Sequence, residues 1–197
     1  MPKETAAGKV VLLLNQDASR ANIAKAFDEV FSKSTEDDFV LFYFSGHGDQ
    51  GFFCPADMPT AKLYHSDVKS WFKGAKAKFR LCIADACFSG SIGRPVPSVP
   101  VSPSVTSDLQ DARIAVVMSS KPNQLSQEYA PFKQGVFSYY LIKGLQGSAD
   151  LNHDSYVTAA EAFLFTKLMV AKKTLGKQVP FVHGRNLEKM PLARIRK

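Results

Sequence analysis

The 197-residue sequence has few of the features that mark secreted, membrane or repetitive proteins. Its three cysteines, Cys54, Cys82 and Cys87, are odd in number and lack the spacing of a disulfide framework or a zinc site. Reduced thiols and a cytoplasmic location are therefore expected. No apolar stretch approaches the ~18 residues that a membrane span needs, and no signal peptide opens the chain. With 45% hydrophobic residues and no internal repeat, the chain is expected to form one globular domain.

Acidic residues are scarce at the C-terminal end. Between Lys167 and Lys197 there are nine lysines or arginines and one acid, Glu188, so this segment carries +8 against +7 for the whole chain. A basic segment can contact nucleic acid or anionic lipid. No interleaved aromatic residues or nucleic-acid module accompany it. A solvated basic face is the simpler interpretation, and no nucleic-acid partner is expected.

Strand-like and helix-like segments alternate along the chain, which predicts an α/β fold with a mainly parallel sheet and helices on both faces. Residues 10–14 are expected to form a buried strand, and Ser19 to cap the helix that follows. Further strands are expected at residues 40–44, 80–84, 114–118 and 181–182. The expected helices carry these apolar residues: Ile23, Ala26, Phe27, Val30 and Phe31; Val68, Trp71 and Phe72, after a cap at Ser66; Val136, Phe137, Tyr140, Leu141 and Leu145; Leu164, Leu168, Ala171 and Leu175. The segment rich in proline and serine from residue 94 is expected to be a mobile loop.

Two short motifs follow apolar runs and carry the chemistry. Ser45-Gly46-His47-Gly48 follows the run at 40–44, and Asp85-Ala86-Cys87-Phe88-Ser89-Gly90 follows the run at 80–84. The carboxyl ends of parallel strands meet at one sheet edge, where open α/β folds place their ligands. A thiol with a pKa of about 8.5 is mostly protonated at neutral pH, so an imidazole that takes its proton makes it a nucleophile.

The same motifs have structural alternatives. A cysteine inside an apolar strand is usually a small buried hydrophobe, which is the interpretation for Cys82. Cys87 lies beyond its strand and stays open between a reactive and a packing role. His47 stands between glycines, which give it little to pack against. The N–H groups of Gly48 and Cys87 are the candidates for an oxyanion hole.

These two segments, 41–48 and 81–90, resemble the histidine and cysteine motifs of the caspase-like peptidases, closest to the bacterial metacaspase type. The similarity extends to residues 119–128, 135–140 and 180–182. It implies a caspase-like α-β-α sandwich and a cysteine endopeptidase acting on protein or peptide substrates. Cys87 would be the nucleophile, and His47 the base and acid. The domain would divide into residues 1–93, a linker loop at 94–110, and residues 111–197.

The resemblance also implies a substrate pocket. Asp85 matches the acid that selects Arg or Lys at the cleavage position, and a carboxylate would pair with a guanidinium and repel an acidic side chain. A strand-end acid that caps backbone N–H groups is the alternative for Asp85. Ser119 and Gln124 lie in the matching segment and are expected to contact the substrate. Arg94 makes self-cleavage in the linker loop conceivable without requiring it.

Two departures from the family pattern bear on activity. Family members begin with an interior strand before the one expected at residues 10–14, and nothing in this chain matches it. Without that strand, a neighbouring strand would lose its hydrogen-bond ladder. A partner or an upstream segment is therefore expected to complete the sheet, and a catalytically inactive module that binds a partner is the alternative function. Residues 49–53 lack the acid-rich insert that binds activating calcium in many metacaspases.

A different calcium signal occurs later in the chain. Asp150, Asn152, Asp154, Tyr156, Thr158 and Glu161 match the ligand positions of an EF-hand loop, with Tyr156 offering its carbonyl. Ser155 stands where that loop requires glycine. Thr158 and Glu161 also fit a capping box for the following helix, which is the structural alternative. Calcium is thus a candidate ligand, while the peptidase chemistry itself needs no cofactor.

Overall fold

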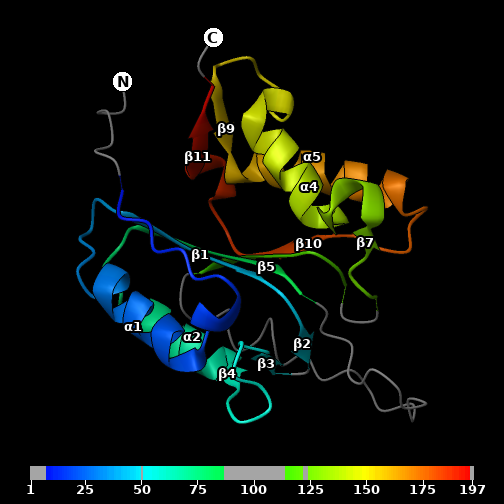
Figure 1. The fold of residues 1–197 in the computed structure, drawn as a ribbon. Coiled ribbons are helices and arrows are strands. Elements are labelled where there is room, and N and C mark those ends of the chain that lie inside the picture. The colour runs from blue at the N-terminus through cyan, green and yellow to red at the C-terminus, as the bar shows by residue number, and fades with distance from the viewer. Residues whose placement is uncertain (1–7, 50, 87–113, 122–123, 196–197) are drawn as a thin grey trace.

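The computed structural model describes residues 8–49, 51–86, 114–121 and 124–195. A four-stranded sheet forms its centre, in the order β1-β5-β6-β10. Helices α1 and α2 lie on one face and α4 and α5 on the other (Figure 1). The strands are β1 (Phe39–Ser45), β5 (Phe79–Asp85), β6 (Ala115–Met118) and β10 (Phe181–His183), and the helices are α1 (Arg20–Phe31), α2 (His65–Gly74), α4 (Val136–Lys143) and α5 (Ala159–Lys173). The first three strands are parallel and β10 is antiparallel, which confirms the predicted α-β-α sandwich with a mainly parallel sheet.

Short strands and helices lie around this central sheet. β2 (Gly48–Asp49), β3 (Phe52–Phe53) and β4 (Leu63–Tyr64) form a small antiparallel sheet directly after β1. β7 (Glu128–Tyr129) pairs with β8 (Gln134–Gly135), and β9 (Tyr156–Thr158) pairs with β11 (Pro191–Arg194), a strand that the sequence analysis did not predict. The described residues also form three short 3-10 helices, η1 (Asn15–Asp17), η2 (Ala130–Phe132) and η4 (Leu187–Lys189), and one π-helical segment, η3 (Gly144–Ser148).

The central strand β5 divides the core into two clusters. Its residues from Leu81 to Asp85 are all buried, as expected for a parallel strand covered on both faces. Cys82 and Ala84 face the cluster under α1 and α2, whereas Leu81 and Ile83 face the cluster under α4 and α5. The alternation of side chains along one apolar strand thus joins both layers of helices.

Helix α1 has the expected cap and apolar face. Ser19 Oγ accepts a hydrogen bond from Asn22 N at 3.3 Å, and Phe27 contacts the rings of Phe31 and Trp71. Helix α2 begins earlier than predicted, at His65, and the side chain of its N-cap residue Tyr64 makes no capping hydrogen bond. The predicted cap at Ser66 is therefore wrong.

The prediction of a buried strand at residues 10–14 is also wrong. Val10, Leu12 and Leu14 are 85%, 75% and 58% exposed, and in the described part of the chain the segment has no strand partner. Only Leu13 packs against the core. High β-propensity does not by itself form a strand, because the segment must also lie in register beside another strand.

The predicted apolar face of α5 is wrong as well. Leu164, Leu168 and Leu175 are 46%, 62% and 87% exposed, and Leu175 lies beyond the end of the helix. The buried face carries the smaller residues Ala159, Ala162, Thr166 and Val170. Small side chains allow α5 to pack closely against α4 and the sheet, so the leucines are left outside.

Candidate functional site

The ends of β1 and β5 bring the histidine motif and the first residue of the cysteine motif, Asp85, to one edge of the sheet. The parallel register aligns Ser45 with Asp85, and Gly46 N donates to the Asp85 carbonyl at 3.1 Å. His47 follows at once and is exposed. Its carbonyl accepts a hydrogen bond from Cys54 N at 2.9 Å, which ties the histidine turn to the loop after β3. The imidazole at this position is therefore accessible to solvent.

Gly48, one of the two candidates for the oxyanion hole, is the first residue of β2 and pairs with Phe53. It follows His47 directly, so the small antiparallel sheet fixes the backbone of the histidine turn on its far side. Cys87, the predicted nucleophile and second oxyanion donor, lies outside the described residues, as does the whole predicted linker loop at 94–110. The last described residue before Cys87 is Ala86, and its side chain is buried.

Asp85 is buried and held by the N-terminus of α4. Its Oδ2 accepts hydrogen bonds from Ser138 Oγ and, at 3.3 Å, from Ser138 N. Burial raises the pKa of the Asp85 carboxyl group, and the hydrogen bonds from Ser138 and Ser119 oppose that rise. The N-cap residue Gly135 has no side chain, so Asp85 supplies the oxygen that caps the helix.

Gly135 and Tyr43 also contribute to the surroundings of the Asp85 carboxylate. A Cβ on Gly135 would lie 2.6 Å from Asp85 Oδ2, so only glycine leaves room for the acid here. Tyr43, from β1, has its hydroxyl 2.6 Å from Ser138 Oγ. A chain of hydrogen-bonded groups therefore runs from β1 through α4 to Asp85. Sequence reasoning missed Tyr43 and Ser138, because no local pattern connects positions 95 residues apart.

Ser119 lies beside the same strand end and is fully buried. Its N–H donates to the Ala84 carbonyl at 2.9 Å, and its Oγ lies 2.5 Å from Ser126 Oγ. The structure thus brings together the histidine turn, Asp85 and Ser119. Gln178, another fully buried polar residue, donates to the Ser119 carbonyl at 2.9 Å and accepts from Gln127 N at 2.9 Å. Gln178 thus holds two points of the segment after β6, Ser119 and Gln127, in place.

Gln124 uses both ends of its amide within the fold. Its Nε2 donates to the Gly176 carbonyl at 3.1 Å, and its Oε1 accepts from Val179 N at 2.8 Å. These bonds hold the turn between α5 and β10. In the described arrangement, the Gln124 side chain braces that turn, and its expected contact with substrate stays a prediction.

The other two cysteines are poor nucleophiles. Burial raises the pKa of the Cys82 thiol to about 12, in agreement with a packing role. Cys54 is half-buried, and both its burial and the charge of Asp49 raise its pKa. Because the thiolate is the reactive form, neither thiol is activated at neutral pH.

In the predicted calcium loop, the side-chain oxygens accept hydrogen bonds from groups of the loop itself. Asp150 accepts from the backbone N–H groups of Asp154 and Ser155 at 3.1 Å, and Asn152 Oδ1 accepts from Asp154 N at 2.9 Å. Glu161 Oε2 accepts from Thr158 N and Thr158 Oγ1, and Thr158 Oγ1 accepts from Glu161 N. These bonds form the capping box of α5. No group of three or more His, Cys, Asp or Glu side chains that could hold a metal ion occurs among the described residues.

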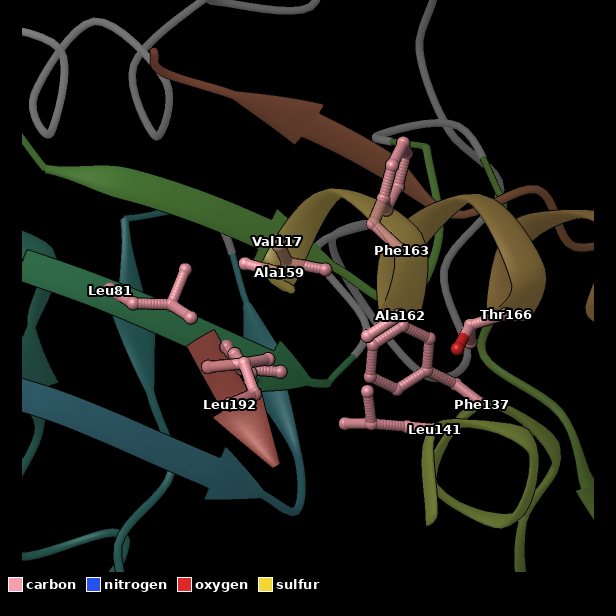
Figure 2. A pocket seen from close by; sticks show the side chains of 10 residues that line it. Leu81, Val117, Phe137, Leu141, Ala159, Ala162, Phe163, Thr166 and Leu192 are labelled. Carbon is pink, nitrogen blue, oxygen red and sulfur yellow. The ribbon is translucent and has the colours of Figure 1, made fainter. Parts of the chain in front are cut away.

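A small pocket lies away from these motifs, between the sheet and the α4 and α5 layer (Figure 2). Its lining residues are Leu81, Ile83, Val117, Phe137, Leu141, Ala159, Ala162, Phe163, Thr166 and Leu192. All except Thr166 are apolar, so the pocket is a packing gap of the core and holds no group suited to acid, base or nucleophilic chemistry.

Comparisons with known proteins agree with this arrangement. A sequence model of the caspase domain family matches residues 8–191. The crystal structure of protein GSU0716 from Geobacter sulfurreducens is similar in fold, with 18% identity and a TM-score of 0.61 over 93% of this chain and 82% of that one. No curated protein sequence matches the chain. None of the described helices is long and apolar enough to cross a bilayer. The match over nearly the whole chain, on an α-β-α sandwich with the histidine motif at the sheet edge, shows that the chain belongs to the caspase domain family of peptidases.

Proposed function

We propose that this protein is a cysteine endopeptidase that uses a dyad of Cys87 and His47 and cleaves after Arg or Lys. The observation that carries the proposal is the register of β1 and β5. Ser45 and Asp85 lie side by side, and each motif places its reactive residue two positions further along the chain. Membership of a peptidase family, which implies a protein substrate, supports the same assignment.

In the proposed reaction, His47 takes the proton of the Cys87 thiol, and the thiolate attacks the substrate carbonyl carbon. The N–H groups of Gly48 and Cys87 would hold the negative oxygen of the tetrahedral intermediate. His47 then gives its proton to the departing amine, which leaves an acyl group on Cys87. Water, deprotonated by His47, hydrolyses this thioester and regenerates the thiol. Every step uses groups of the chain and water, so no cofactor is needed.

Asp85 is proposed to bias the pocket toward basic side chains. Its carboxylate lies two residues before the nucleophile, and a cation brought near it would favour its ionised form. Its hydrogen bonds with Ser138 support the alternative, in which it caps α4. Asp85→Asn separates the two roles. Pocket selection predicts lost preference for arginine over neutral residues, whereas capping alone predicts lower stability with unchanged preference.

Short fluorogenic peptides ending in Arg, Lys or Asp test the function. We expect turnover after Arg and Lys, and complete loss in Cys87→Ala and in His47→Ala. Cys54→Ser is the matched control and should retain activity, because its thiol is not activated. Turnover that survives Cys87→Ala, or a preference for Asp, would contradict the proposal.

A second candidate function is that of an inactive caspase-like module that binds a partner. The open edge of β1 in the described structure favours it, because that edge is where another segment would complete the sheet. Folded protein without turnover on any of these peptides, with and without calcium, would decide for this alternative.

Calcium binding by the loop that contains Asp150, Asn152, Asp154 and Tyr156 remains a separate proposal. A bound ion must raise the unfolding temperature, since it binds only the folded state. Unfolding in calcium and in chelator tests it, with Asp150→Ala as the variant that should abolish any difference.

A further inference from the structure

The sheet has an unprotected edge at β1. In the described part of the chain, β1 pairs with β5 alone, so the other side of this seven-residue strand has no ladder. Natural edge strands are usually short, bulged, or protected by charged residues or proline. β1 has the sequence Phe-Val-Leu-Phe-Tyr-Phe-Ser and none of these protections. Such a strand is a template for a further strand.

The side chains of β1 also favour an additional strand. Val40 and Phe44 are buried in the cluster under α1 and α2. Leu41 and Tyr43 point to the opposite face and are 39% and 41% exposed. A strand added beside β1 would cover the exposed parts of Leu41 and Tyr43 on one face and extend the buried layer of Val40 and Phe44 on the other, so a strand that is apolar on both faces fits best.

The same chain carries a segment with these properties. Residues 10–14 are Val-Val-Leu-Leu-Leu, all aliphatic and without charge. Val10, Leu12 and Leu14 are mostly exposed, and the segment forms no ladder within the described structure. Its neighbour Lys9 is paired with Glu29 of α1 at 3.1 Å, and Leu13 packs on the core, so the segment lies along its own domain without joining its sheet.

We propose that two copies of this chain form a symmetric dimer in which residues 10–14 of each copy pair with the open edge of β1 in the other. In the described part of each copy, the β1 edge and the aliphatic segment 10–14 both lack a strand partner, so a twofold axis satisfies both at once. Strand addition of this kind gains backbone hydrogen bonds and buries alternate side chains. Charge repulsion does not oppose it, because neither element carries a charged residue.

The mass in solution, measured by light scattering over a wide range of concentration, tests the dimer. We expect a dimer that dissociates on dilution. Leu12→Pro removes a backbone donor and Leu41→Lys places a charge beside the edge, so each should weaken dimerisation at least about tenfold. Leu168→Lys, at a leucine of α5 that is 62% exposed, is the matched control and should dimerise like the wild type. Circular dichroism confirms that each variant is folded.

Crosslinking distinguishes exchange between copies from pairing within one chain. Leu12→Cys protein and Leu41→Cys protein, both carrying Cys54→Ser and Cys87→Ala, are mixed and treated with a flexible bis-maleimide. We expect a covalent product that joins the two chains. The double variant Leu12→Cys/Leu41→Cys in the same background reports pairing within one chain. A wild type that stays monomeric at all concentrations, a dimer that persists in both Leu12→Pro and Leu41→Lys, or a crosslink that forms only within single chains of the double variant would overturn the proposal.

Discussion

At the scale of single residues, the most constrained group is Asp85. A buried carboxyl group is costly unless hydrogen bonds satisfy it, and here Ser138 and the first turn of α4 do so. The same atoms make the acid part of the fold and place it two residues before the proposed nucleophile. Changes around it are therefore expected to affect stability and substrate preference together.

Gly135→Ala tests this constraint. Gly135 has φ −58°, which any residue tolerates, so only the contact at 2.6 Å with Asp85 Oδ2 opposes the new methyl group. We expect a loss of about 1–3 kcal/mol in the free energy of unfolding, typical of an overpacked core. Urea unfolding measures it. Gly74→Ala is the control, because its Cβ would meet no atom within 4 Å, and an equal loss there would refute the steric explanation.

His65 predicts a dependence of stability on pH. The imidazole is buried against Phe53, and burial lowers its pKa from 6.5 to about 4. Between those values the unfolded chain binds the proton and the folded chain does not, so the free energy of unfolding falls as the pH is lowered from 6.5 toward 4. The full effect is about 3 kcal/mol.

Urea unfolding over this pH range compares the wild type with His65→Leu. The wild type should lose stability relative to His65→Leu steadily as the pH falls from 6.5 toward 4. His153→Ala, at an exposed histidine, should follow the wild type. If the free energy of unfolding changes with pH in the same way in the wild type and in His65→Leu, His65 is not the cause of the loss of stability at acidic pH.

At the scale of elements, most of the apolar runs became strands and the caps at Ser19 and Thr158 begin helices, whereas the run at 10–14 and the cap at Ser66 did not. The runs at 40–44, 80–84 and 114–118 became β1, β5 and β6, because each has a neighbouring strand in the sheet. Residues 10–14 are similarly apolar but form no ladder in the described structure, because apolar composition does not decide which strand a segment will lie beside. In α5 the spacing of the leucines predicted that they form the buried face. The buried face instead carries smaller residues such as Ala159 and Ala162, because these allow close packing. The histidine motif was predictable as a strand end, whereas Tyr43, Ser138 and Gln178 were not, since their contacts depend on tertiary structure.

The capping box at the start of α5 gives a prediction for one element. Thr158→Ala removes the oxygen that accepts from Glu161 N, and we expect a loss of about 1 kcal/mol in stability, with or without calcium. Thermal unfolding measures the loss. Thr158→Ser keeps the hydroxyl and should retain most of the stability. A loss seen only in calcium would instead assign Thr158 to an ion site.

At the scale of the whole molecule, the layers predict a gradient of stability. β5 has ladders on both sides and buried side chains on both faces, whereas β1 is open on one side. Among β5, β1 and residues 10–14 of the dilute protein, hydrogen exchange followed by mass spectrometry should find the slowest backbone exchange in β5 and the fastest in residues 10–14. If the proposed dimer forms, protection of residues 10–14 and of β1 should rise with concentration. Uniform exchange over β1 and β5 would contradict this gradient.

The pairing of β5 with β6 has a consequence for a broken chain. The two strands are separated by 29 residues in sequence but are aligned from Leu81 with Ala115 to Ala84 with Met118. Tyr43 and Asp85 contact Ser138 across the same division. A single cut between β5 and β6 would therefore leave two fragments held together by the sheet and by a shared core. Such a protein would keep its native mass in solution and separate into two bands only after denaturation.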